Sequence, residues 1–113
     1  VDKSASSIAV TRENIESTGF IKTSRILNMD SIDYLKTAKS GLDIALLDPP
    51  YNMGLIEQAL PLLNPKMNDG GIVVCEHEKE LTLPEEIGNL KQRKRYKYGK
   101  KAVTTFVKHL NVE

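Results

Sequence analysis

Short apolar runs alternate with segments of helical periodicity along most of the chain. Leu42–Leu47 and Ile72–Glu76 are dominated by aliphatic residues, which is typical of strands buried in a parallel sheet. In Ser4–Thr18 and Gly54–Leu63, apolar residues recur at the spacing of one helix face, and Gly19 follows the first of these segments as a C-cap. The pattern therefore predicts helices and strands in alternation.

Weaker signals fill the remaining segments. Arg25–Met29 predicts a short strand, and Ser31–Lys39 predicts a helix capped by its first serine. The proline and glycine within Glu78–Asn89 indicate an irregular connection with one helical turn. Lys91–Tyr98 and Lys101–Lys108 flank a Gly-Lys pair, and the second arm is rich in β-branched residues, so these arms predict a β-hairpin.

This order of elements predicts an α/β fold. We expect a sheet that is mostly parallel and that ends in a C-terminal antiparallel hairpin. A length of 113 residues suits one domain, so we expect residues 1–113 to form a single, partial domain. The chain begins with Val1 instead of methionine, and we therefore expect a piece of a longer polypeptide.

Composition narrows the class of protein only modestly. The chain is 40% apolar and 27% charged, as in ordinary globular proteins, and no apolar run approaches the about 20 residues that span a bilayer. We expect a cytoplasmic protein. The one cysteine, Cys75, lies in an apolar run and is expected to be a buried, reduced thiol. His77 and His109 match no metal-ligand spacing, so we expect the protein to bind no metal. We expect His77, in a loop after a strand, to be solvated or to support neighbouring site residues, and His109 to lie at the surface.

Charge is concentrated near the C-terminal end, although the net charge is only +1. Alternation along a strand would place Tyr96 and Tyr98 on one face and the cations on the other. Those expected cations are Lys91, Arg93, Arg95 and Lys97, with Lys100 in the turn. They would either contact RNA phosphates or protect a solvated edge strand, and the sequence leaves both readings open.

The candidate chemistry lies directly after Leu42–Leu47, in Asp48-Pro49-Pro50-Tyr51. Open α/β sheets bind ligands at the carboxyl ends of their strands, and the two prolines keep nearby carbonyls out of a helix. Asp48 and the Pro49 carbonyl could accept hydrogen bonds from the amine of a flipped base while Tyr51 stacks on its ring. The alternative is that Asp48 caps the next helix and Tyr51 packs on its neighbours.

The tetrapeptide resembles the motif of S-adenosylmethionine-dependent amino-methyltransferases. A longer ordered set is similar to the bacterial small-subunit ribosomal RNA guanine-N2 methyltransferase family: Val1-Asp2-Lys3, Asn28-Met29-Asp30, Leu46 to Tyr51, Val73 to Glu76, Arg95 to Gly99, and Val103-Thr104. The resemblance implies a Rossmann-like methyltransferase sheet and S-adenosylmethionine as cofactor. It also implies ribosomal RNA or a small-subunit assembly particle as partner, with no membrane and no metal.

The resemblance also assigns roles to single residues. It implies that Asp48, Pro49, Pro50 and Tyr51 are catalytic. Asp2 would bind the cofactor ribose hydroxyls, and Asp30 with Ser31 would contact the adenine edge. An exposed terminal acid at Asp2 and a helix N-cap at Asp30 remain open as alternatives.

One part of the family pattern is missing from this sequence. Members carry, upstream of the matched region, a first strand and a glycine-rich loop, whereas Gly54 and Gly70-Gly71 follow helices or turns. We therefore expect a sheet truncated at its N-terminal side, which a dimer or chain exchange could complete. Rival hypotheses are an adenine-N6 nucleic-acid methyltransferase, a noncatalytic RNA-binding module, and an unrelated α/β domain that buries Tyr51 in its core.

Because no glycine-rich loop precedes a helix, we expect the 113-residue chain to bind S-adenosylhomocysteine weakly and to be a poor catalyst. Isothermal titration calorimetry of the chain with this product measures the affinity directly. A tight one-to-one isotherm would contradict the expectation.

Overall fold

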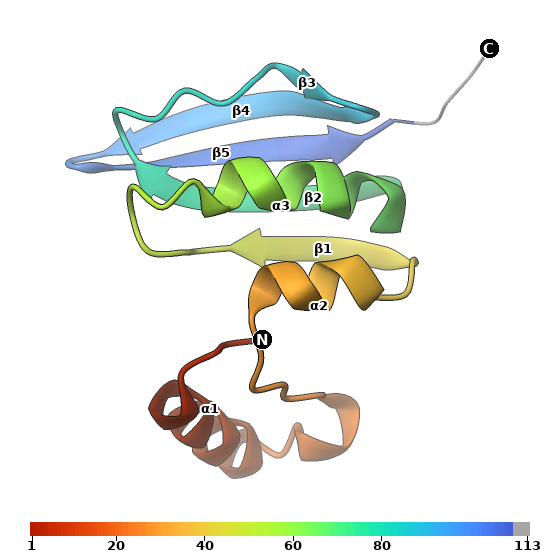
Figure 1. The fold of residues 1–113 in the computed structure, drawn as a ribbon, viewed down its shortest axis with the longest axis vertical. Coiled ribbons are helices and arrows are strands. Elements are labelled where there is room, and N and C mark those ends of the chain that lie inside the picture. The colour runs from red at the N-terminus through yellow and green to blue at the C-terminus, as the bar shows by residue number, and fades with distance from the viewer. Residues whose placement is uncertain (110–113) are drawn as a thin grey trace. The chain divides into compact units, whose positions relative to one another are not determined.

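The computed structural model describes residues 1–109, and the chain divides into two compact units. The first unit is Val1–Thr37, and the second begins at Ala38 (Figure 1). The first unit is mainly helical, and the second contains the sheet. The expectation of one domain over residues 1–113 remains a prediction.

Helix α1 (Ala5–Thr18) confirms the first predicted helix and its Gly19 C-cap, and Ser4 is its N-cap. The Ser4 hydroxyl accepts a hydrogen bond from Ser7 N at 3.3 Å, which satisfies one N–H group of the first turn. Gly19 ends the helix at a φ of 79°, and its N–H donates back into the last turn. The chain then passes through a short 3-10 helix, η1 (Ile21–Thr23).

The predicted strand at Arg25–Met29 is wrong. This segment makes only an isolated parallel bridge, in which Asn28 pairs with Asp2. The Asp2 N–H donates to Leu27 O at 3.1 Å, and Met29 N donates to Asp2 O at 3.0 Å. A strand needs a paired neighbour along its length, and these hydrogen bonds hold the segment at one point only.

Helix α2 (Ser31–Thr37) is shorter than predicted and has a different cap. The Asp30 carboxylate, not Ser31, accepts hydrogen bonds from the Ile32 N–H and the following one, at 2.9 and 3.1 Å. A carboxylate at this position is favoured by the partial positive charge of the helix N-terminus. The helix ends at Thr37 instead of Lys39.

The second unit is a five-stranded sheet with one long helix. Its elements are β1 (Leu42–Leu47), α3 (Leu55–Leu63), η2 (Asn64–Lys66), β2 (Met67–Glu78), β3 (Glu86–Ile87), β4 (Leu90–Tyr98) and β5 (Lys101–Lys108). The strand order is β1-β2-β5-β4-β3, and only β1 and β2 are parallel. The sheet is therefore mixed, and the expectation of a mostly parallel sheet is wrong. Only β1 and β2 are joined through a helix, which a parallel crossover requires, whereas β4 returns to β5 through a tight turn.

The two faces of the sheet differ in burial. The covered face consists of Val73, Cys75, His77, Ala102, Thr104 and Phe106, all buried. Four apolar residues of α3 are buried as well, and Figure 1 draws this helix in front of β2. The opposite face, called the open face below, includes Ile44, Leu46, Ile72, Val103 and Tyr96.

Strand β1 is not the buried strand that its apolar sequence predicts. It lies at the edge of the sheet, and its open-face residues Ile44 and Leu46 are 66% and 75% exposed. An uninterrupted aliphatic run is typical of a strand covered on both faces, so the sequence pattern alone predicted burial here.

Strand β2 starts before the predicted Ile72–Glu76 strand and includes Asp69-Gly70-Gly71. Leu42 pairs with Met67 and Ile44 with Ile72, so extra residues of β2 bulge out between these pairs. Gly71 is required at this point, since a Cβ there would lie 2.7 Å from the Asn68 carbonyl oxygen. The two glycines therefore lie in a bulge of β2, and β1 and β2 pair on either side of it.

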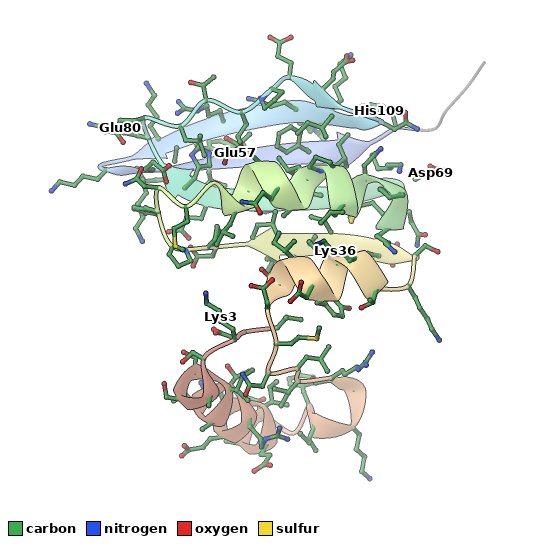
Figure 2. The ribbon with its side chains drawn as sticks, viewed as in Figure 1. Lys3, Lys36, Glu57, Asp69, Glu80 and His109 are labelled. Atoms are coloured by element: carbon green, nitrogen blue, oxygen red, sulfur yellow. The ribbon has the colours of Figure 1, made fainter. Side chains whose placement is uncertain are left out.

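The C-terminal hairpin is confirmed, with one irregularity. Strand β4 contains a bulge between Gln92 and Lys94, which leaves Arg93 as an extra residue opposite β5. Ahead of it, the connection from Lys79 contains a turn and the short strand β3, and the expected helical turn is absent among these described residues. His109 is exposed at the end of β5, as predicted (Figure 2).

His77 is buried, which rules out the solvated loop position but not the alternative of a supporting role near the site. Because β2 continues to Glu78, alternation turns the imidazole onto the covered face. Its Nε2 lies 2.8 Å from Thr104 Oγ1, and its Nδ1 lies 2.7 Å from the carbonyl oxygen of Glu78. Both ring nitrogens thus have partners, which is what a buried polar ring requires.

We expect Thr104→Val to lower the free energy of unfolding by about 1–3 kcal/mol, because it removes the partner of a buried imidazole nitrogen without changing side-chain shape. Thr105→Val is the matched control, because Thr105 lies on the open face, is partly exposed and makes only a 3.5 Å hydrogen bond. Urea denaturation measures both variants. Equal stability of the two would contradict a structural role for this hydrogen bond.

Candidate active site

The Asp48-Pro49-Pro50-Tyr51 segment leaves the carboxyl end of β1. Leu47 and Cys75 form the last pair of the parallel ladder. Asp48 therefore follows the end of β1 at the level of Glu76, where β2 still continues. Parallel strands bring their carboxyl ends to the same edge of a sheet, and this edge is the one near Glu80 in Figure 2. The segment therefore lies at the sheet edge where open α/β folds bind ligands.

Asp48 and Tyr51 both face solvent. The exposed Asp48 carboxylate has no side-chain hydrogen bond or ion pair among residues 1–109, and Tyr51 is 38% exposed. Helix α3 begins after Gly54, which provides no side-chain cap. The alternative in which Asp48 caps this helix is therefore wrong, and so is the unrelated domain with Tyr51 in its core.

A strained turn connects the tetrapeptide to α3. Asn52 has a φ of 61° and Gly54 a φ of 64°, both in the left-handed region. Asparagine tolerates this region better than most residues, and such conformations are common in ligand-binding loops. The segment between β1 and α3 is therefore irregular.

A small hollow lies beneath the turn. It is lined by residues of the turn, of α3 and of the end of β2, including Pro49, Pro50, Met53, Glu76, His77 and Leu81. Its volume is about 10 Å³, which is the space of roughly one water molecule. A planar base does not fit inside it in this conformation, so the exposed side of the tetrapeptide is the accessible part of the site.

Lys101 joins this edge from the hairpin. Its Nζ lies 2.9 Å from Glu76 Oε1. The hydrogen bond and charge of Glu76, followed by weaker attraction from Tyr51 and Asp48, raise the pKa of Lys101. Sequence reasoning missed both Lys101 and Glu76 as site residues, because their approach depends on the antiparallel pairing of β2 with β5.

The expected cofactor residues lie in the first unit. The bridge between Asp2 and Asn28 brings Asp2 next to the segment that leads to Asp30. Asp2 Oδ1 accepts a hydrogen bond from Ser4 N at 2.8 Å, and Asp30 Oδ1 caps α2. In both carboxylates, Oδ2 has no hydrogen-bond partner among the described residues. Ser31 is exposed at the start of α2.

The expected RNA-contacting cations do not share one face. The bulge after Gln92 places Lys91 on the open face and leaves Arg95 and Lys97 on the covered-face side. The Arg95 guanidinium donates to the carbonyls of Lys79 and Leu81 at 2.6 and 3.1 Å, so it holds the connection after β2. The remaining candidates, Arg93, Lys97 and Lys100, are exposed.

Two further observations concern the described part of the chain. Residues 1–109 contain no group of three or more histidine, cysteine, aspartate or glutamate side chains arranged to hold a metal ion. None of the helices in this range is both long enough and apolar enough to cross a membrane.

Comparison with known proteins identifies relatives over most of the chain. A family described as "Conserved hypothetical protein 95" matches residues 1–107. "Putative rRNA methyltransferase YlbH" of Bacillus subtilis is 26% identical over 113 residues, which is 96% of this chain and 61% of that protein. "Ribosomal RNA small subunit methyltransferase D" of Haemophilus influenzae is 34% identical over 74 residues, which is 60% of this chain and 38% of that protein. The chain thus spans less than two thirds of each of these relatives.

A solved structure shares the fold. A conserved hypothetical protein from Streptococcus pyogenes superposes with a TM-score of 0.87 at 29% identity, covering 95% of this chain and 68% of the other. The α/β arrangement with a mixed sheet is therefore shared with a relative of known structure.

Cys75 is expected to be unreactive in the folded chain. It is free and buried, and desolvation raises the pKa of its thiol to about 12, so almost no thiolate is present at neutral pH. We expect Ellman's reagent to label it rapidly only after unfolding in urea. The unfolded thiol ionises near its usual pKa of about 8.5, so the free energy of unfolding should fall as pH rises above that value. Rapid labelling of the folded chain at about pH 8 would contradict this burial.

Proposed function

Because this chain belongs to the conserved hypothetical protein 95 family, we propose that it forms part of an enzyme that methylates an exocyclic amine of a nucleobase. The proposed target is guanine N2 in small-subunit ribosomal RNA, and the proposed place of action is the cytoplasm. Two relatives bear the names of ribosomal RNA methyltransferases, which supports an RNA substrate.

The observation that carries the proposal is the exposed tetrapeptide at the carboxyl end of β1. Asp48 is exposed and is not used by α3 as a cap. Tyr51, three residues later in the same turn, is 38% exposed. A carboxylate and a flat aromatic face in one turn are suited to a planar ring that carries an amine.

The residues of the turn would act by position and by charge. The amine lone pair is delocalised into the base, so the nitrogen becomes positive as it bonds to a methyl carbon. Asp48 would accept one N–H of the amine and the Pro49 carbonyl the other, which stabilises that developing charge. Tyr51 would stack on the base and hold the amine in line for attack. Pro50 would keep the turn rigid.

Asp2, Asp30 and Ser31 are the residues that would hold S-adenosylmethionine. The Oδ2 atoms of the two carboxylates have no partner among the described residues, so they can accept hydrogen bonds from ribose hydroxyls and from an adenine amine. Ser31 offers a hydroxyl beside Asp30. When bound, this cofactor supplies a methyl group on a positively charged sulfur.

Exposed cations support an RNA substrate. Arg93, Lys97 and Lys100 lie along β4 and its turn, where they could contact phosphates. Arg95 would contribute mainly by fixing the connection after β2, because its guanidinium already donates to two carbonyls.

We expect Asp48→Asn to reduce methyl transfer to guanine-containing small-subunit RNA by about 10²-fold or more, with RNA affinity unchanged. The rate is measured with radiolabelled S-adenosylmethionine, on this chain and on any longer protein encoded by the same reading frame. Asp43→Asn is the matched control, because Asp43 is an exposed aspartate at the other end of β1.

The outcomes separate the rival functions. Transfer to adenine N6 and not to guanine would favour an adenine methyltransferase. Unchanged activity in Asp48→Asn would remove the role proposed for this carboxylate. RNA binding with no methyl transfer by any form of the protein would favour a noncatalytic RNA-binding module.

A further inference from the structure

Two tyrosines lie side by side on the open face of the hairpin. Tyr96 and Tyr98 are neighbours along β4, with ring centroids 6.4 Å apart and ring planes inclined by 27°. They are 42% and 62% exposed. Large aromatic side chains usually bury most of their surface, so a nearly parallel pair with accessible rings is available for contact with a ligand.

The pair belongs to the same end of the sheet as the tetrapeptide. Tyr96 pairs with Val103, and Val103 pairs with Glu76. Glu76 directly follows Cys75, the partner of Leu47, so the row that begins at Asp48 continues across the sheet to Tyr96. An RNA strand bound at Asp48 could therefore extend along this row and over the two tyrosines without crossing the covered face.

The surroundings of the rings are positively charged. Lys94 precedes Tyr96 on the same face, since it pairs with Thr105, and Lys101 lies opposite Tyr98. Arg93 and Lys100 are exposed nearby. Lys101 is paired with Glu76, whereas Lys94, Arg93 and Lys100 have no carboxylate within 4.0 Å among residues 1–109. Exposed aromatic rings bordered by cations favour a polyanion with planar groups over an apolar protein surface.

We propose that Tyr96 and Tyr98 form a stacking platform for unpaired nucleotides that flank the target base, with Lys94 contacting a phosphate. The proposal rests on the proposed function only in taking RNA as the substrate. Every base has a flat face, so stacking selects single-stranded over paired RNA without requiring one sequence. Bases inside a duplex are stacked on each other and cannot cover these rings.

The test measures, by fluorescence anisotropy, the affinity of the chain for a fluorescein-labelled single-stranded RNA roughly ten nucleotides long. The double variant Tyr96→Leu/Tyr98→Leu should bind about tenfold more weakly or worse, because it removes both rings. The double variant with phenylalanine at both positions keeps the rings and should bind within about twofold of the original chain. The same RNA annealed to its complement should bind more weakly than the single strand.

Four further measurements make the result specific. Ile44→Thr changes an exposed apolar residue of the open face far from the rings and should leave RNA affinity unchanged. The affinity falls as salt rises, and Lys94→Gln should make this dependence shallower. The magnitude of the slope of log affinity against log salt should decrease by about 0.7, the value for one phosphate on a single strand. Because the chain has no tryptophan, tyrosine emission can be followed directly, and RNA should quench it in the original chain. Circular dichroism checks that each variant is folded.

Some outcomes would overturn the platform. These are unchanged single-strand affinity in the folded leucine double variant, equal loss in Ile44→Thr, or equal binding of the duplex. The methyl-transfer assay on Asp48→Asn is a separate readout. If the tyrosine variants bind RNA normally but Asp48→Asn loses methyl transfer, the platform is wrong and the proposed function is still supported. If RNA binding depends on the two rings but no methyl transfer occurs, only the platform is supported.

Discussion

The parallel pairing of β1 with β2 is the constraint on which the rest of the structure depends. A helix must connect parallel neighbours, so α3 has to start just beyond β1 and return the chain to the beginning of β2. That path leaves the turn after β1 at the same edge as the end of β2, and it places Asp48 beside Glu76. The antiparallel hairpin then completes the edge, because β5 begins there with Lys101. Chain topology, more than any single contact, assembles this group of side chains.

Much of the fold could be predicted because its signals are local. β1, α3 and the hairpin are each marked within a few residues by aliphatic runs, helical spacing or a Gly-Lys turn. The errors arose where long-range pairing decides the outcome. Arg25–Met29 has strand-like residues but only a single bridge, whereas β2 begins five residues before the predicted Ile72 and includes Asp69-Gly70-Gly71 in a bulge. The burial of His77 follows from the added length of β2, which no local pattern around that histidine indicates.

The site was predicted in part for the same reason. The tetrapeptide is contiguous, so its residues lie together whatever the rest of the chain does. Roles that depend on distant partners were less predictable. Arg95 looked like one cation in a basic strand, yet it binds the carbonyls of a connection that packs against it. Asp30 instead of Ser31 caps α2, because both residues are good caps and only the path of the chain chooses between them.

The bulge at Arg93 changes how the hairpin can vary in length during evolution. In a regular strand, the residues after Gln92 would alternate in the opposite phase and turn both tyrosines toward α3. The extra residue shifts the alternation by one position, so both tyrosines lie on the open face. A related sequence that lacks one residue at position 93 would therefore keep the same side chains on each face, in a regular ladder. A gap anywhere between Lys94 and Tyr98 would reverse the faces of the residues beyond it. Among family members, single-residue gaps in this strand should accumulate at the bulge and be rare in the rest of it.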